Sequence, residues 1–518
     1  MLDQGQFSAR IKKTIIAGAS PTVISFAMQR KEIRMNKPLG FRGSAVAVGV
    51  ALALGLPALA LGGPRDVDSM VLDQLRAQGR ADIFVKMSSD ASLADADSYG
   101  SKNARAQHVY DVLSANAAVT QQGLRKYLDQ HAIGYQVFWI NNSILIRNAS
   151  RDLVNEIAAR SDVAYIRGNH TMKLDVVDAV AKPSKGTDAV EWGIQKIRAP
   201  DVWATGNTGV GVVVSSVDTG VRYTHTALVN QYRGNNGDGT FTHDYNWFDP
   251  SKVCGNPSLA PCDNNEHGTH TMGTMVGGDG LGPFTNDIGV APGAKWMAAK
   301  GCETNSCSDT ALIGSAQFIA CPTKTDGTAP DCTKAPDVVN NSWGGGGHDP
   351  WYFTYVQAWR AAGIIPVFSA GNNGSGCQSM GSPGDYPNVI GVGAISQNDT
   401  LASFSSKGPG LFPAHRLKPD IVAPGDNVRS SINTNDNAYG LLSGTSMAAP
   451  HIVGSVALYL SANPGAAYGA VYNAFRGTAS QALNAPPGPD SCGNRNFDVY
   501  PNPIYGWGRV DIAAALGN

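Results

Sequence analysis

The chain has little charge of either sign. Of its 518 residues only 16% are charged, 40 Lys and Arg stand against 41 Asp and Glu, and the formal net charge is -1. Proteins that bind nucleic acid or acidic membrane surfaces usually carry a basic excess. The composition therefore argues against a nucleic acid partner.

Long apolar runs are also scarce. The one candidate, residues 45–61, contains Gly and Pro and is shorter than the roughly 20 apolar residues that a membrane span needs. A basic stretch without acids precedes it, and Ala58-Leu59-Ala60 fits the small-x-small pattern before a signal peptidase cut. We therefore expect a signal peptide over residues 35–60, secretion, and no stable membrane insertion after cleavage. Residues 1–34 are an upstream extension or follow from a wrong start codon.

Cysteine is absent from the first 253 residues, and no two cysteines are spaced as CxxC. This spacing argues against a metal cluster, which together with reduced buried thiols is the alternative to disulfides. An even set indicates disulfides formed after export, although eight cysteines allow 105 pairings. Local closure predicts the pairs Cys254–Cys262, Cys302–Cys307, Cys321–Cys332 and Cys377–Cys492.

The length exceeds one ordinary core, so we expect a small and a large unit. Within residues 66–176 the pattern predicts, in order, a strand, a long helix, a strand pair, a helix and a strand, over residues 81–87, 108–131, 135–146, 152–159 and 163–167. This βαββαβ order is that of a small α+β ferredoxin-like domain. A polar linker with a cleavage zone, residues 177–189, follows and contains Pro183.

Residues 190–518 have a different pattern. Short β-branched runs alternate with helical or loop segments, at residues 210–217, 294–300, 337–340, 364–370, 389–394 and 420–423. Apolar strands separated by helices predict an α/β domain with a parallel sheet and helices on both faces. Functional side chains then belong at the carboxyl ends of the strands.

The first of these strands ends in Asp218-Thr219-Gly220. A carboxylate at this place can stay ionised and orient an imidazole. Asp-Thr-Gly also occurs in pepsin-like aspartic proteases, but these need two such carboxylates and the chain has one copy. An Asp that only forms a turn is the simpler alternative.

A histidine opens the next segment, His267-Gly268-Thr269-His270-Thr271-Met272-Gly273. His267 at a helix start can act as a general base near neutral pH. Gly268 and Gly273 are expected to let this helix pack closely against the sheet. A metal site at His267 and His270 is the alternative, but their spacing is not the i, i+4 spacing of HExxH zinc proteases. We expect His270 to be a packed residue.

Ser446 lies in Gly444-Thr445-Ser446-Met447-Ala448, before an apolar helix that runs to about residue 462. The N-terminus of a helix favours an oxyanion, and a neighbouring base would make the hydroxyl nucleophilic. A helix-capping Ser is the alternative, and the pattern differs from the Gly-x-Ser-x-Gly elbow of lipases. Asn372, in the turn Ser369-Ala370-Gly371-Asn372, can add a second oxyanion donor.

The order Asp218, His267, Ser446 is that of subtilisin. The segments DTG, HGTHTMGTM, SAGN and GTSMAAPH resemble the signature segments of the subtilisin-like serine proteases, and the similarity covers residues 190–516. The segments EWGI at residue 191 and YGWGRVD at residue 505 resemble the bacillopeptidase F branch of this family.

The resemblance implies a secreted serine endopeptidase that acts on proteins or peptides through an acyl-enzyme and needs no cofactor for catalysis. The implied triad is Asp218, His267 and Ser446, with Asn372 in the oxyanion hole. Extended substrate would add as a strand beside the implied pocket residues Ser342, Trp343, Gly344, Ser369, Ala370 and Gly371.

The resemblance also implies that residues 66–176 are an inhibitory propeptide, removed by self-processing; a retained accessory domain is the alternative. An inactive subtilase-fold binding protein is the alternative to the enzyme as a whole. The family commonly binds structural calcium, for which Asp238 is an oxygen-rich candidate.

Overall fold

The computed structural model describes residues 66–174, 176–177, 180–184, 189–278, 287–411 and 417–518. The expected upstream extension (1–34) and signal peptide (35–60) lie outside these residues. Within the described part of the chain, no helix combines the length and the apolar character needed to cross a membrane.

A small sheet is built from the expected βαββαβ unit. Its strands β2 (Arg80–Met87), β3 (Tyr135–Phe138), β4 (Ser143–Ser150) and β5 (Val163–Gly168) pair antiparallel in the order β5-β2-β4-β3. The ferredoxin-like order is therefore confirmed. A short strand β1 (Asp66–Val67), parallel to β5, and helix α1 (Ser69–Gln78) precede it and were not predicted.

The long helix expected over residues 108–131 is two helices and begins earlier. Helix α2 (Lys102–Thr120) starts after Ser101, whose hydroxyl accepts from the backbone N–H of Ala104, and α3 (Gln122–Gln130) follows. The two meet at buried Gln121, whose side chain donates to the carbonyl of Phe138. The second predicted helix is α4 (Arg151–Ala158).

The large sheet is parallel throughout, with strand order β15-β14-β13-β12-β8-β10-β9. All six predicted strands are present, and the edge strand β9 is the one that the pattern missed. The strands are β8 (Val213–Asp218), β9 (Trp247–Phe248), β10 (Lys295–Lys300), β12 (Val338–Asn341), β13 (Ile365–Ser369), β14 (Ile390–Ile395) and β15 (Ile421–Pro424).

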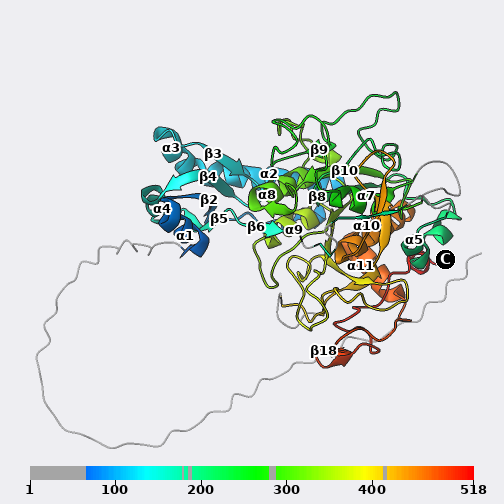
Figure 1. Cartoon of the computed structure of the whole chain (residues 1–518). Helices are drawn as coiled ribbons and strands as arrows, with labels where there is room; N and C mark the ends of the chain where they lie inside the picture. The colour runs from blue at the N-terminus through cyan, green and yellow to red at the C-terminus, as the bar shows by residue number, and fades with distance from the viewer. Residues whose placement is uncertain (1–65, 175, 178–179, 185–188, 279–286, 412–416) are drawn as a thin grey trace, which may run out of the picture. The chain divides into compact units, whose positions relative to one another are not determined.

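Helices cover both faces of this sheet, as predicted (Figure 1). Alternate residues explain the two layers: Val214 faces the cluster that contains α7 (His267–Val276), α10 (Thr445–Ala462) and α11 (Tyr468–Thr478), whereas Val217 faces the cluster of α8 (Asp309–Ala320) and α9 (Phe353–Ala361). The second cluster also takes Phe84 and Val109 of the small domain. Shorter helices are α5 (Trp192–Lys196), α6 (Ala199–Trp203) and α12 (Ile512–Ala515).

All eight cysteines are paired as predicted. The disulfides are Cys254–Cys262, Cys302–Cys307, Cys321–Cys332 and Cys377–Cys492. The second closes the loop between β10 and the short strand β11 (Ser306–Ser308). The fourth reaches the hairpin of β18 (Ser491–Cys492) and β19 (Arg495–Asn496).

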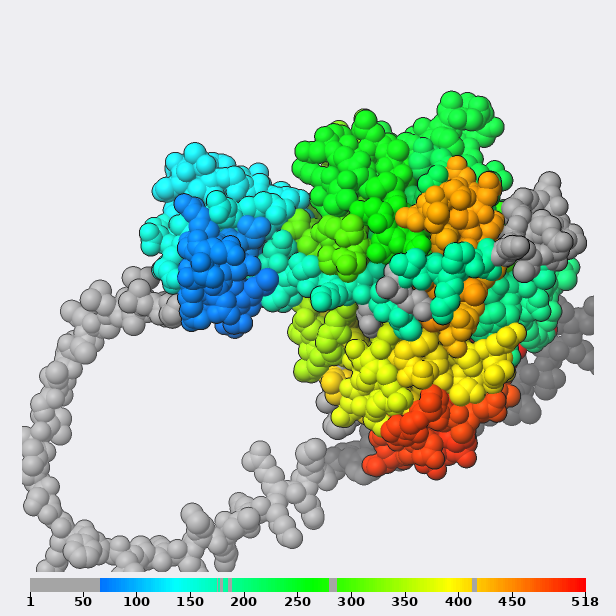
Figure 2. All heavy atoms as spheres, viewed as in Figure 1, coloured from blue at the N-terminus to red at the C-terminus, as the bar shows by residue number. Residues whose placement is uncertain are grey.

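One strand before the expected cleavage zone and one strand within it add to the large domain. Strand β6 (Thr171–Lys173) pairs antiparallel with β11, and β7 (Lys182–Ser184) pairs antiparallel with β17 (Tyr439–Leu442), which in turn pairs with β16 (Val428–Ser431). The connector is thus partly a strand, contrary to expectation. Pro183 is tolerated because β7 is an edge strand. Figure 2 shows the teal stretch near residue 180 against the orange segment near residue 440.

Candidate active site

The end of β8 and the start of α7 bring an acid and an imidazole together. Asp218 Oδ1 accepts from His267 Nδ1 at 2.8 Å, and both side chains are at most 2% exposed. Burial lowers the pKa of His267, but the charge and hydrogen bond of Asp218 outweigh it, and the net pKa is raised above its ordinary value. Because Nδ1 donates to the carboxylate, the lone pair of the neutral ring lies on Nε2.

Asp218 is itself held by two further donors. The backbone N–H of Thr219 donates to Oδ1 at 2.7 Å, and the Thr271 hydroxyl donates to Oδ2 at 3.2 Å. These bonds fix the plane of the carboxylate, and thereby the orientation of the ring that it holds. Sequence reasoning did not identify Thr271.

A second carboxylate, also missed, ties the two segments together. Asp263 Oδ1 accepts from the Thr219 hydroxyl at 2.9 Å, and Oδ2 accepts from the backbone N–H of Thr269 at 2.9 Å. The Thr219 hydroxyl oxygen in turn accepts from the backbone N–H of Gly268 at 2.9 Å. Asp263 therefore satisfies open N–H groups at the start of α7 while it locks this helix onto the Asp-Thr-Gly turn.

The glycines of α7 permit the close approach. A Cβ on Gly268 would lie 2.1 Å from the Gly220 carbonyl oxygen, so only glycine fits against the turn. Gly273 packs instead against Ser430 and Ser431 of β16, with a Cβ 2.3 Å and 2.4 Å from their hydroxyls. The expected contact with the large sheet is thus wrong for Gly273.

His270 is buried and bound to backbone. Its Nε2 lies 3.0 Å from the Val428 carbonyl oxygen and 3.3 Å from that of Gly440. Burial lowers its pKa to about 3, so the ring is neutral at physiological pH. This environment makes His270 a packing residue.

Ser446 is the second residue of α10, on the helix that packs directly on α7. Its hydroxyl donates to the Ser342 carbonyl oxygen at 3.2 Å, while the Ser342 hydroxyl donates to the Ser446 carbonyl oxygen at 2.9 Å. No hydrogen bond joins the Ser446 hydroxyl to His267 among the described residues, and His267 Nε2 is buried without a hydrogen-bond partner there.

Two donors converge beside Ser446. Asn372 Oδ1 accepts from the backbone N–H of Thr445 at 2.8 Å and from its hydroxyl at 2.9 Å, which fixes the amide plane. A Cβ built on Gly444 would lie 3.5 Å from both Asn372 Nδ2 and the Ser446 backbone nitrogen. Gly444, at φ 156° and ψ 158°, thus keeps open a space that both donors border.

A cavity of about 420 Å³ lies over Ser446 and contains residues that the resemblance implied for substrate. Ser342, Trp343, Gly344, Ser369, Gly371 and Asn372 line it. Ala370 does not: it is fully buried, and its backbone N–H donates to the Val392 carbonyl. The chain's own Met172, Lys173, Leu174 and Val176 also line the cavity, which sequence reasoning missed.

The structure does not support the metal sites considered from the sequence. Asp238 Oδ1 accepts from the backbone N–H of Thr240 at 2.9 Å and from its hydroxyl at 2.6 Å, so it closes a turn. No group of three or more His, Cys, Asp or Glu able to hold a metal occurs in the described ranges.

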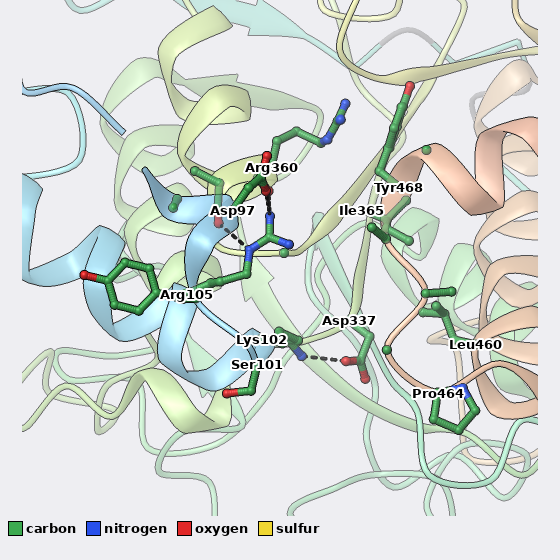
Figure 3. Close-up of a pocket in the computed structure, with 18 of the residues that line it drawn as sticks. Asp97, Ser101, Lys102, Arg105, Asp337, Arg360, Ile365, Leu460, Pro464 and Tyr468 are labelled. Atoms are coloured by element: carbon green, nitrogen blue, oxygen red, sulfur yellow. Dashed lines mark hydrogen bonds and ion pairs between the residues drawn. The ribbon is translucent and has the colours of Figure 1, made fainter. Parts of the chain in front are cut away.

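A larger cavity, about 760 Å³, lies away from these residues, between α2 and the large domain (Figure 3). Lys102 Nζ donates to Asp337 Oδ1 at 2.6 Å and to the Ala335 carbonyl at 2.8 Å. Arg105 donates to the carbonyls of Arg360 and Ala361 at the end of α9, both at 3.1 Å. The cavity therefore marks a contact of the small domain with the large one and holds none of the candidate catalytic groups.

Comparison with known proteins gives concordant matches. The subtilase family matches residues 209–508. Bacillopeptidase F of Bacillus subtilis (strain 168) is 37% identical over 428 residues, which cover 79% of this chain and 28% of that protein. Subtilisin Savinase of Lederbergia lenta is 33% identical over 327 residues, which cover 63% of this chain and 98% of that protein. An alkaline protease of Alkalihalobacillus alcalophilus is 32% identical over 342 residues, which cover 66% of this chain and 74% of that protein.

Proposed function

Because the chain belongs to the subtilase family of serine endopeptidases, we propose that it is a secreted endopeptidase that cuts peptide bonds through an acyl-enzyme on Ser446. The observation that carries this assignment is the buried hydrogen bond from His267 to Asp218, because it leaves Nε2 as the free base of the ring. The chain aligns with only 28% of Bacillopeptidase F, so the substrates of that protein are not transferred to it.

In this mechanism the Ser446 hydroxyl leaves the Ser342 carbonyl and turns to His267. Nε2 then takes the hydroxyl proton as the oxygen attacks the substrate carbonyl. The imidazolium returns this proton to the leaving amine as the C–N bond breaks. A water molecule repeats the sequence on the ester: Nε2 takes its proton, hydroxide adds, and Ser446 leaves with the proton. Asp218 stabilises the imidazolium throughout.

The oxyanion of each tetrahedral intermediate is placed in the space beside Gly444. Asn372 Nδ2 and the Ser446 backbone N–H border this space, and the Thr445 bonds prevent the Asn372 amide from turning its oxygen inward. Preorganised donors of this kind each contribute about 100-fold or more to kcat.

The small domain, residues 66–176, acts in this proposal as an inhibitory propeptide for the catalytic domain, residues 190–518. Its tail supports this role: β6 adds to β11, and residues up to Val176 line the cavity over Ser446. A partly buried ion pair holds the tail in place, since Arg167 Nε lies 2.9 Å from Asp309 Oδ2. Residues 177–189 then contain the processing site.

Labelling with a fluorophosphonate tests the assignment. Wild type expressed from Met35 should react and should mature beyond Leu174 on N-terminal sequencing, whereas Ser446→Ala should do neither. Ser461→Ala is a matched control on α10, because Ser461 is half-buried at the far end of the helix and donates to the Val210 carbonyl. Labelling that survives Ser446→Ala would refute the nucleophile, and identical trimming of both precursors would refute self-processing.

A further inference from the structure

Two described stretches of the chain come close to Ser446: the first, which ends at residue 177, lines the cavity, and the second, residues 180–184, lies beside Met447 and is used by neither the triad nor the cavity. Strand β6 lies on β11 before the serine, and β7 lies on β17 after it. The antiparallel register pairs Lys182 with Leu441 and Ser184 with Tyr439, so β7 leads away from Ser446. This is the direction in which the residues after a cut bond would run.

The Ala181 side chain, in this second stretch, is enclosed. Ala181 is 4% exposed and belongs to an apolar cluster that includes Leu442 and Met447, the residue after the catalytic serine. A Cβ on Gly440 would lie 2.7 Å from the Ala181 Cβ, closer than carbon atoms pack. The contact leaves room for a methyl group at position 181 only because residue 440 is glycine.

The backbone at the same place meets a charged acceptor. Glu266, the residue before the general base, accepts from the Ala181 N–H through Oε1 at 2.6 Å. A peptide N–H bonded to a carboxylate is among the stronger hydrogen bonds in proteins. One carboxylate and one glycine therefore select, at a fixed place beside Ser446, an extended backbone with a small side chain.

We propose that Gly440, Glu266 and the edge of β17 form a subsite for the residues that follow the cut bond, specific for a small side chain at the position of Ala181 and continued by strand addition. This inference rests on the proposed function and names the substrate class of that site: extended proteins or peptides with Gly or Ala at one primed position. The chain's own residues 181–184 are its first occupant.

The test measures kcat/KM of the mature enzyme on two kinds of substrate. Internally quenched peptides share the residues before the cut and carry Gly, Ala or Leu at one primed position at a time. A peptide p-nitroanilide with the same residues before the cut has no amino acids beyond it. At one primed position wild type should prefer Ala to Leu by about tenfold or more, because overpacking is costly.

Two variants assign this preference. Gly440→Ala should shift it from Ala to Gly at that same position, and Glu266→Gln should lower the ratio of extended peptide to p-nitroanilide about fivefold, because a neutral acceptor replaces a charged one. Asp326→Asn, in an exposed turn, is the matched control and should change neither ratio.

The outcomes separate the two proposals. If the p-nitroanilide is cut but the quenched peptides show no selectivity at any primed position, the subsite is refuted while the proposed peptidase activity stands. Equal profiles for wild type and Gly440→Ala would also overturn it. If neither substrate is cut, the proposed function itself fails.

Discussion

Replacing Asp218 by Asn should remove a charge without disturbing the geometry of the site. Asp218 Oδ1 accepts from the Thr219 backbone N–H as well as from His267. If the nitrogen of the Asn amide took the Oδ1 position, it would face these two donors and could accept from neither. The amide oxygen therefore takes the Oδ1 position. Its nitrogen faces the Thr271 hydroxyl, which can accept because its own proton can go to the Gly268 carbonyl at 3.1 Å.

The expected cost is that of the lost charge. Two unit charges about 4 Å apart attract by about 4 kcal/mol at an effective dielectric constant of about 20. The imidazolium forms only as the reaction proceeds, so this energy is lost from the transition state, and kcat should fall about 1,000-fold.

The pH profile should move as well. Asp218 raises the pKa of His267 against the effect of burial, and hydrolysis needs the neutral ring, so wild-type activity is lost as the pH falls through this raised pKa. In Asp218→Asn the burial effect remains unopposed by that charge, and the acidic limb should shift to lower pH.

Measurement of kcat on a peptide p-nitroanilide between pH 4 and pH 9 gives both results. Thr271→Val is the matched control: it removes one neutral donor to the carboxylate and leaves the charge of Asp218 in place, and a loss of about fivefold with little movement of the acidic limb is expected. A loss below tenfold in Asp218→Asn, or an acidic limb that stays in place, would refute the electrostatic argument.

Three further substitutions probe the surroundings. Gly444→Ala should lower kcat about 100-fold or more with a smaller change in KM, because the new Cβ would fill the space between the oxyanion donors; a change in KM alone on the p-nitroanilide would contradict this. Cys302→Ala combined with Cys307→Ala opens a short loop and should lower the free energy of unfolding by about 2 kcal/mol in denaturant titration; unchanged stability would contradict the prediction. Lys102→Met removes the bonds to Asp337 and Ala335 and should speed release of the cleaved small domain about fivefold, seen as earlier onset of activity; an unchanged lag would show that these bonds do not retain it.

The large sheet could be predicted because its strands are buried on both faces. Each of the six predicted runs is short and contains consecutive apolar residues, and the turn residues between them mark the ends. The disulfides followed from the same local reasoning, since three of them close loops of 5, 8 and 11 residues and leave one remaining pair.

The strands missed by sequence reasoning depend on distant partners. Residues 171–173 are polar and mixed in character, and they become β6 only because β11 offers a free edge more than a hundred positions later. Likewise β7 contains a proline, which argues against a strand until the position at the edge of β17 is known. Local pattern carries no information about either edge.

The candidate site likewise contains residues that the local sequence pattern predicts and residues that depend on distant partners. The contact between Asp218 and His267 follows from the rule that functional groups lie at the carboxyl ends of parallel strands. Asp263 and Glu266 could not be found in this way, because their distant partners, the Thr219 hydroxyl and the Ala181 backbone N–H, come near only in the folded chain. The catalytic roles of Asp218, His267, Ser446 and Asn372 stay predictions, and the labelling experiment tests that of Ser446.

The contacts of the small domain and of the connector that follows it fall into two classes with separable effects. Those of β6 with β11, and of Ala181 with Glu266, lie on the path that a substrate would take, so a change that weakens inhibition there should also weaken substrate binding. Those of Lys102 and Arg105 lie beside the distant cavity of Figure 3, where no substrate path runs. Substitutions in this second class should alter how long the small domain stays bound while KM remains constant, so under the proposed function inhibition and specificity should respond to different substitutions.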